Sequence, residues 1–296
     1  MYGPNLIART LTRVRAYGTK KNPRNWQYNS RSDVHSQVAC WSVAFDLLMT
    51  CQLLRQHTAD GKVGFGLNHE MRDFHNNKEK DLDLVLCRPH ASQIAKYQRS
   101  KLLRRPIQSF ADLAEHLQLP LDAAERADLV KLPVLPIVPV GMVHVALEAK
   151  AAMTEFSKAE SRLFSELDSS ISVINGHAQH AIAGALVMVN VASQFISPII
   201  NRADYGTKPI SISQHRNQPK PAQGVIDTIK QLRRRSSDRD RGFDAIGIVV
   251  VEMVNDGSPC RVVTSSPPGL PSSDSLHYDQ MIARAAHVYS QRFASV

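Results

Sequence analysis

The order of strands and helices in the middle of the chain limits the fold more than any other sequence feature. Residues 143–150 read Val-His-Val-Ala-Leu-Glu-Ala-Lys, an apolar strand that ends in Glu-x-Lys. Residues 157–160 have a capping-box sequence, and an apolar stripe with helical spacing follows at Ala159, Leu163, Leu167 and Ile171. Residues 181–191 form a second apolar strand. This order predicts two parallel strands joined by a right-handed crossover.

A further apolar segment, residues 81–87, opens with two acidic residues. Side chains alternate across a strand, which predicts one face with Asp81, Asp83 and Val85 and another with Leu82, Leu84 and Leu86. By the same rule Glu148 and Lys150 share a face, with Leu147 and Ala149 on the other. If the two strands are neighbours, two carboxylates and an ammonium group converge at one edge of a sheet.

The flanking segments complete an α/β pattern, a central mixed β-sheet flanked by helices. We expect helices over residues 32–57 and 276–293 and strands over residues 62–67 and 243–254. Residues 90–140 are interpreted as a helical insertion that includes a basic helix over 92–103 and a capped helix over 109–117. We expect one domain over residues 32–296, preceded by a basic N-terminal arm over residues 1–31.

The charge balance favours a polyanionic partner. The chain of 296 residues has 36 Lys and Arg against 27 Asp and Glu, a formal net charge of +9. Nucleic acid is the first candidate partner and an anionic membrane surface the second, although a basic soluble protein needs neither. Residues 1–31 hold no acidic residue and have interleaved aromatic residues, as in an arm that tracks phosphates or in a poorly ordered terminus.

The cysteines indicate a reducing compartment. The four of them form no Cys-x-x-Cys pair, so we expect free, buried thiols and a cytoplasmic protein. The N-terminus lacks the apolar core and cleavage site of a secretory signal. The most apolar run, residues 181–196, is too short to cross a bilayer comfortably, and we expect no membrane association.

An Asp strand followed by an apolar strand ending in Glu-x-Lys resembles the PD-(D/E)XK nuclease superfamily, which includes many restriction endonucleases. The resemblance covers about residues 32–195 and implies a restriction-endonuclease-like core. In that family the Asp and Glu bind Mg²⁺, for which Mn²⁺ can substitute, and the Lys serves the attacking water. These roles fall on Asp83, Glu148 and Lys150. Asp81 is an alternative metal ligand, and Leu82 stands where the family has Pro.

The resemblance implies a Mg²⁺-dependent DNA endonuclease that acts in restriction or antiviral defence, with a homodimer as the simplest state for double-strand cleavage. Two alternatives stay open: a non-catalytic nucleic-acid-binding protein on the same fold, and a protein whose basic surface binds an acidic protein. Weaker metal-ligand candidates are Glu70 with Asp73 and His177 with His180. The candidate contacts to the nucleic-acid backbone are Lys158, Arg162, Arg233, Arg234 and Arg235.

Overall fold

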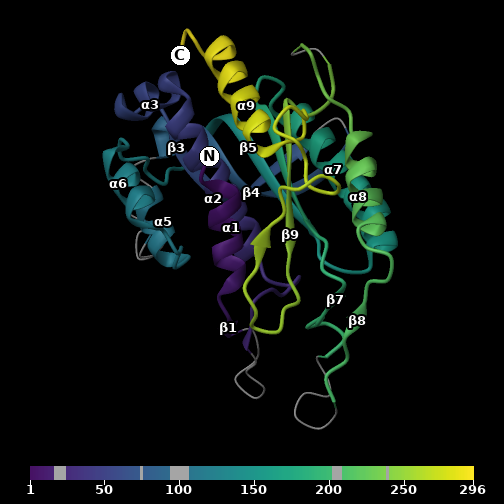
Figure 1. The fold of residues 1–296 in the computed structure, drawn as a ribbon. Coiled ribbons are helices and arrows are strands. Elements are labelled where there is room, and N and C mark those ends of the chain that lie inside the picture. The colour runs from purple at the N-terminus through teal and green to yellow at the C-terminus, as the bar shows by residue number, and fades with distance from the viewer. Residues whose placement is uncertain (17–24, 74–75, 94–106, 202–208, 238–239) are drawn as a thin grey trace.

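A mixed β-sheet lies at the centre of the computed structural model, which describes residues 1–16, 25–73, 76–93, 107–201, 209–237 and 240–296 (Figure 1). Within these residues the sheet has six strands in the order β10-β9-β6-β5-β4-β3. The strands are β3 (Gly64–Asp73), β4 (Lys78–Pro89), β5 (Val140–Ala152), β6 (Ile182–Asn190), β9 (Ala245–Glu252) and β10 (Arg261–Val262). Strands β5, β6 and β9 are parallel and the other neighbours antiparallel. The predicted α/β class and the parallel pair β5–β6 are confirmed.

Helices cover both faces of this sheet (Figure 1). One face packs on α1 (Gly3–Thr12), α2 (Val34–Thr50) and α9 (Tyr278–Arg292), and the other on α7 (Phe156–His177) and α8 (Lys220–Lys230). The remaining elements are α3 (Gln52–Ala59), α5 (Phe110–His116), α6 (Ala123–Lys131), a 3₁₀ turn (Ala91–Gln93) and two small pairs, β1 (Arg15–Ala16) with β2 (Asn25–Trp26) and β7 (Gln194–Phe195) with β8 (Ser213–Gln214). All four cysteines are buried and free, as expected.

The long helix predicted over residues 32–57 is in fact two helices. Cys51 has an extended backbone (ψ 102°), and α2 and α3 meet there at 97°. The guanidinium group of Arg55 donates hydrogen bonds to the carbonyl oxygens of Leu48 and Met49, which the end of α2 leaves without helical partners. Among the described residues, no single helix is long and apolar enough to cross a membrane, and the bent pair of α2 and α3 matches a membrane span by length and composition only.

Of the two predicted capping boxes, only one forms. Ser109 and Asp112 exchange the two expected hydrogen bonds at the start of α5. Helix α7 instead begins at Phe156 after Glu155, whose backbone is left-handed (φ 51°), so Ser157 lies inside the first turn and cannot cap it. The capping-box prediction for residues 157–160 is therefore wrong, although the helix itself is confirmed.

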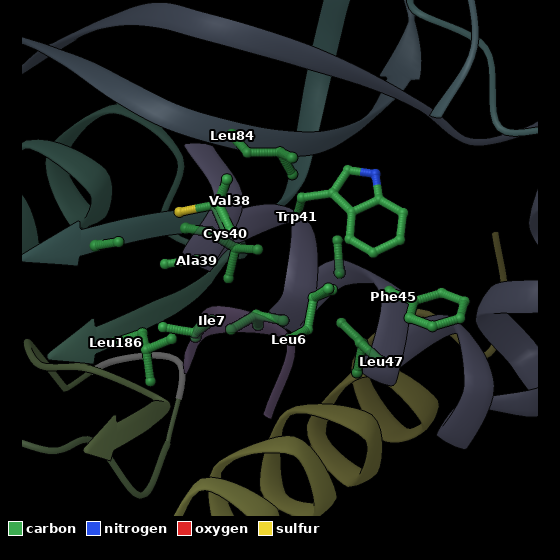
Figure 2. Packing of buried hydrophobic residues seen from close by; sticks show 14 of the residues in the cluster. Leu6, Ile7, Val38, Ala39, Cys40, Trp41, Phe45, Leu47, Leu84 and Leu186 are labelled. Carbon is green, nitrogen blue, oxygen red and sulfur yellow. The ribbon is translucent and has the colours of Figure 1, made fainter. Parts of the chain in front are cut away.

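The predicted N-terminal arm is also wrong where the structure describes it. Residues 3–12 form α1, and Leu6, Ile7 and Leu11 are buried in the same apolar cluster as α2. Figure 2 shows Leu6 and Ile7 within this cluster. The Oε2 atom of Glu125 in α6 lies 2.5 Å from the guanidinium group of Arg9. The apolar spacing of these residues makes α1 amphipathic, and burial of its apolar face outweighs the basic composition of the segment. The rest of the expected arm includes residues 17–24, which lie outside the described residues.

The predicted insertion joins the core through α5 and a return segment. The indole of Trp41 in α2 stacks on Phe110 with ring centroids 4.6 Å apart and donates a hydrogen bond to its carbonyl oxygen. The backbone N–H of Phe65 in β3 donates to the carbonyl oxygen of Pro136, and the N–H of Val138 donates to the carbonyl oxygen of Phe65. These bonds hold the return segment alongside β3 just before β5 begins. The basic helix expected over residues 92–103 falls mostly outside the described residues.

We predict that Leu6→Ala lowers the free energy of unfolding by about 2–5 kcal/mol, because it removes a fully buried side chain between α1 and α2. Val14→Ala, at a half-exposed position just after α1, is the matched control and should stay within about 0.5 kcal/mol of the wild type. Urea unfolding followed by circular dichroism measures both. Equal stabilities of the two variants would contradict a packed α1.

His144 in β5 is a buried titratable group on the α9 side of the sheet. Its ring stacks on Phe293 at 4.5 Å, and neither ring nitrogen has a hydrogen-bond partner among the described residues. Burial, with smaller contributions from the charges of His57 and Arg88, lowers the pKa of His144 to about 4. The unfolded chain, with a pKa of 6.5 at this residue, therefore binds the proton more tightly than the folded chain.

The stability contributed by neutral His144 is therefore complete above pH 6.5 and is lost as the pH falls towards about 4. We predict that His144→Leu, which is apolar and of similar volume, reduces the fall in stability between pH 6.5 and pH 4. Chemical denaturation at a series of pH values measures this slope. A variant as sensitive to acid as the wild type would show that His144 does not titrate on unfolding in this range.

Candidate active site

The pairing of β4 with β5 ends next to Asp83. Leu84 pairs with Leu147, and the register goes no further towards the start of β4. Opposite Asp83 in β3 lies Asn68, whose backbone is left-handed (φ 45°). Leu82 packs on the α7 side of the sheet, whereas Leu84 packs on the α2 side. The prediction that these leucines share a face is therefore wrong, because regular alternation breaks at this point.

The Asp83 carboxylate occupies the place where the strands part. Its Oδ2 accepts a hydrogen bond from the backbone N–H of Ala149 at 3.0 Å, and its Oδ1 accepts one from the hydroxyl of Ser36 at 2.7 Å. The two oxygens of the Asp83 carboxylate thus accept one hydrogen bond from β5 and one from the first turn of α2. Burial and the negative charge of Glu148 raise the pKa of Asp83, and the two hydrogen bonds and Lys150 partly oppose that rise.

The Glu148 carboxylate is buried beside it. The residue is 2% exposed, and its Oε1 lies 2.7 Å from the Nζ of Lys150 and 3.4 Å from the Nζ of Lys80. Its Oε2 is also buried and has no hydrogen-bond partner among the described residues. Leu147 and Ala149 pack in the apolar cluster on the α2 side, in agreement with the predicted alternation along β5. One oxygen of Glu148 is therefore compensated by two ammonium groups, and the other is buried without a hydrogen-bond donor among the described residues.

Lys150 stays protonated in this setting. Burial alone would lower its pKa, but the charge and hydrogen bond of Glu148 and the charges of Glu166 and Asp83 outweigh burial, and the net pKa is raised. Its Nζ also lies 3.6 Å from the Glu166 carboxylate on α7. The side chain can therefore donate hydrogen bonds and supply positive charge, but it does not act as a base at neutral pH.

Lys80 is a member of this site that the sequence analysis missed. Its ammonium group donates to the carbonyl oxygen of Glu166 at 2.9 Å and to the hydroxyl of Ser170, both on α7. Residues 78–80 read as a polar connection, but they are the start of β4. Extending the alternation back from Leu82 would have placed Lys80 on the same face as Leu82, which packs on α7.

The site opens into a polar pocket of about 270 Å³ between α2 and α7. Asp83 and Lys150 line it together with Ser36, Arg162 and Glu166. A second pocket of about 330 Å³ shares Arg162, Tyr28, Ser30 and Ala151 with the first and extends to Lys158. Two of the predicted basic residues, Lys158 and Arg162, thus line the pockets that lead to Asp83 and Lys150.

Other predicted site residues lie elsewhere. Asp81 is exposed and lies opposite Glu70 of the neighbouring strand β3. Burial lowers the pKa of His69, and the negative charge of Asp81 partly opposes that shift. Asp73 is buried at the end of β3, where its carboxylate accepts hydrogen bonds from Asn76. The structure therefore does not bring Asp81 or the predicted pair Glu70 and Asp73 into contact with Glu148.

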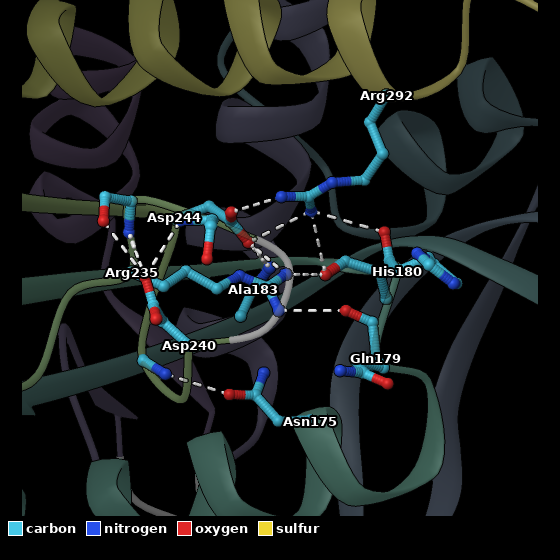
Figure 3. A network of polar contacts seen from close by, with 12 residues as sticks. Asn175, Gln179, His180, Ala183, Arg235, Asp240, Asp244 and Arg292 are labelled. Atoms are coloured by element: carbon cyan, nitrogen blue, oxygen red, sulfur yellow. Dashed lines mark hydrogen bonds and ion pairs between the residues drawn. The ribbon is translucent and has the colours of Figure 1, made fainter.

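Three predicted phosphate contacts follow α8, and they differ in accessibility. Arg233 is exposed and lies 3.3 Å from the carboxylate of Asp168, and Arg234 donates to the hydroxyl of Ser275. Arg235 is 3% exposed and is paired with Asp244 at 2.6 Å (Figure 3). The prediction that Arg235 grips a nucleic-acid backbone is therefore wrong, because its charged head is buried in an ion pair.

The two carboxylates provide part of a cation site. Across the ranges that the structure describes, no three or more His, Cys, Asp or Glu side chains gather in the arrangement of a metal site, and this includes His177 and His180. The oxygens of Asp83 and Glu148 are nevertheless the donors that Mg²⁺ and Mn²⁺ prefer, and Oε2 of Glu148 has no hydrogen-bond partner in the part of the chain that the structure describes. Magnesium keeps several waters in such sites and accepts substrate oxygens, so two protein carboxylates suffice.

Comparison of the chain with protein-family models, curated proteins and solved structures finds no match. The function is therefore inferred from the chemistry of the residues at this site.

We predict that Lys80→Met lowers the free energy of unfolding by about 1–3 kcal/mol, because Ser170 and the carbonyl of Glu166 lose a buried, charged donor. Lys158→Met on the exposed face of α7 removes the same charge and should change stability by less than about 0.5 kcal/mol. Chemical denaturation at pH 7 measures both. A Lys80→Met variant as stable as the control would mean that Lys80 does not hold Glu148 to α7.

Proposed function

We propose that the protein is a Mg²⁺-dependent DNA endonuclease of the PD-(D/E)XK type. The observation that carries the proposal is the convergence of Asp83, Glu148 and Lys150 at the point where β4 and β5 part, beside a polar pocket. Two hard oxygen donors and a protonated amine are the groups that metal-assisted phosphodiester hydrolysis requires.

The topology around the site supports the same family. Helices α2 and α3 are followed by the antiparallel strands β3, β4 and β5, with α5 and α6 inserted between β4 and β5. The chain then passes through α7 to β6, which lies parallel to β5. This is the order of helix, three strands, helix and strand expected for a restriction-endonuclease-like core. The two carboxylates lie on the middle strands of that unit, where the resemblance requires them.

In the proposed reaction Asp83 and Glu148 hold the cation through their oxygens, and Mn²⁺ can replace Mg²⁺. The bound cation supplies charge neutralisation at the scissile phosphate and activation of water. Lys150 donates a hydrogen bond that orients the attacking water and stabilises negative charge as it develops. Ser36 and the backbone of Ala149 keep the Asp83 carboxylate in place, and Lys80 does the same for Glu148.

The charge of the chain supports a nucleic-acid substrate, and DNA in particular follows from the family resemblance. The net charge is +9, and Lys158 and Arg162 line the pockets that lead to Asp83 and Lys150. Contacts of this kind bind phosphates without reading sequence and weaken as salt rises. By the same family resemblance we propose a homodimer, a cytoplasmic location and a role in restriction or antiviral defence.

We predict that Asp83→Asn, Glu148→Gln and Lys150→Met each reduce Mg²⁺-dependent plasmid cleavage by at least about 100-fold. Lys131→Met, on an exposed side chain of α6, is the matched control and should cleave like the wild type. Removal of divalent cations with a chelator should abolish cleavage, and added Mg²⁺ or Mn²⁺ should restore it. Melting curves check that each variant is folded.

Cleavage by folded Glu148→Gln at the wild-type rate would refute the proposed site. DNA binding at low salt without cleavage under any divalent cation would instead favour a non-catalytic nucleic-acid-binding protein. No DNA affinity at low salt would favour an acidic protein as the partner.

A further inference from the structure

The second pocket, of about 330 Å³, adjoins the polar pocket of the candidate active site. The two share Tyr28, Ser30, Ala151 and Arg162 as lining residues. Ala151 directly follows Lys150 in β5, so the pockets lie side by side along the end of that strand. The volume is within the range of about 300–1,000 Å³ that is usual for small-ligand sites. A ligand group attached to a phosphate beside Lys150 can therefore enter the second pocket.

The second pocket differs from the first in being walled largely by apolar side chains. They are Met153 after β5, Ala159 of α7, and Phe195, Pro198, Ile199 and Ile200 beyond β6. Phe195 is buried, whereas Ile199 and Ile200 are 40% and 50% exposed. Contact between these isoleucines and an apolar ligand group is favourable, because it removes both surfaces from water. The chemistry of the walls therefore suits an occupant with an apolar face.

Helix α7 places charged groups along the line from one pocket to the other. Lys158, Arg162 and Glu166 are spaced four residues apart and so lie along one face of the helix. Lys158 lines the second pocket, Glu166 lines the polar pocket and Arg162 lines both. Eight residues of helix span about 12 Å, so both pockets lie within the reach of one nucleotide with its phosphate and its base.

Arg162 is the more available of the two cations on this face. The Nζ of Lys158 lies 2.8 Å from the carboxylate of Glu155, whereas the Nε of Arg162 lies 3.9 Å from that of Glu166. The side chain of Arg162 is also 58% exposed. Its guanidinium group can therefore turn to a phosphate oxygen between the two pockets and bind it through paired, charge-assisted hydrogen bonds.

We propose that the second pocket binds an unpaired nucleobase of the nucleic-acid substrate, beside the phosphate at the candidate active site. Given the proposed function, on which this proposal rests, the substrate is a single strand or a nucleotide rotated out of a duplex. Bases in a duplex are stacked and paired, so they cannot enter such a pocket without leaving the stack. The sugar–phosphate backbone is polar and gains little from an apolar wall, whereas every base has a face that packs on such side chains.

The test is binding of fluorescent oligonucleotides to the intact, metal-free protein, measured by fluorescence anisotropy at constant ionic strength. One probe is a short thymidine strand, and the other is the same strand without its bases, which keeps the backbone charge. We expect the wild type to bind the thymidine strand more tightly. Ile200→Ser should reduce that affinity roughly 5-fold or more, because one wall of the base site is lost, and should leave the affinity for the abasic strand unchanged.

Val134→Ser, at a 73% exposed position outside the walls of both pockets, is the matched control and should bind both strands as the wild type does. Ile200 is half-exposed, so its replacement should leave the fold intact, which melting curves check. A third probe, a duplex with one unpaired thymidine, separates the two substrates. If Ile200→Ser weakens its binding, a rotated-out base enters the pocket; if the effect is confined to the thymidine strand, the substrate is single-stranded. Both results support the pocket.

Equal affinity of the wild type for the thymidine and abasic strands would overturn the proposal, as would an Ile200→Ser variant that weakens both equally or neither. A wild-type dimer that Ile200→Ser dissociates without any change in strand binding would also overturn it, because Ile200 would then contact a second copy of the chain. None of these assays involves cleavage, so the result is separate from nuclease activity. Base-dependent binding without cleavage would keep the pocket and refute the endonuclease.

Discussion

Burial of the Glu148 carboxylate in the middle of the sheet is the constraint on which the site depends. A buried carboxylate needs opposite charge close by, and Lys150 and Lys80 provide it from two adjacent strands. Lys80 is itself fixed to the backbone and a hydroxyl of α7. The compensation of one charge therefore ties β4, β5 and α7 together and fixes the geometry of the pocket they enclose.

The second carboxylate is placed by an interruption of regular structure. If β4 and β5 had stayed paired beyond Leu84 and Leu147, backbone groups would have filled the position that Asp83 now occupies. The interruption lets a charged side chain accept a hydrogen bond from Ala149 and face a pocket. Its raised pKa shows that the arrangement disfavours the ionised form, as is common where carboxylates are brought together for function.

Local patterns in the sequence predicted the parts of this structure that depend on neighbouring residues. Alternation placed Glu148 and Lys150 on one face of β5, and the strand, helix and strand order predicted the parallel pair with β6. The partners of Lys80 are 86 and 90 residues away, and no local pattern could show them. The Arg-rich turn had the same limit, because the burial of Arg235 depends on carbonyl groups of residues 179 and 181.

Composition misled where burial decided the outcome. The basic N-terminal segment suggested an arm, but an apolar stripe of three residues in it was enough to bury α1 against α2. In the same way, the helix predicted over residues 32–57 has continuous apolar spacing, yet its two halves pack at 97° to each other because Cys51 has an extended backbone. In both segments the tertiary packing, rather than the charge or spacing, determined the position of the chain.

The most direct test of the proposed site is a crystal soaked in Mn²⁺ and measured for anomalous scattering. We expect a peak between the carboxylates of Asp83 and Glu148, with oxygen ligands at about 2.0–2.6 Å, as for hard divalent cations. We also expect the distance between the Glu148 carboxylate and the Nζ of Lys150 to increase from 2.7 Å as the cation binds the carboxylate. A crystal with Mn²⁺ bound elsewhere and none between the carboxylates of Asp83 and Glu148 would contradict the proposed site.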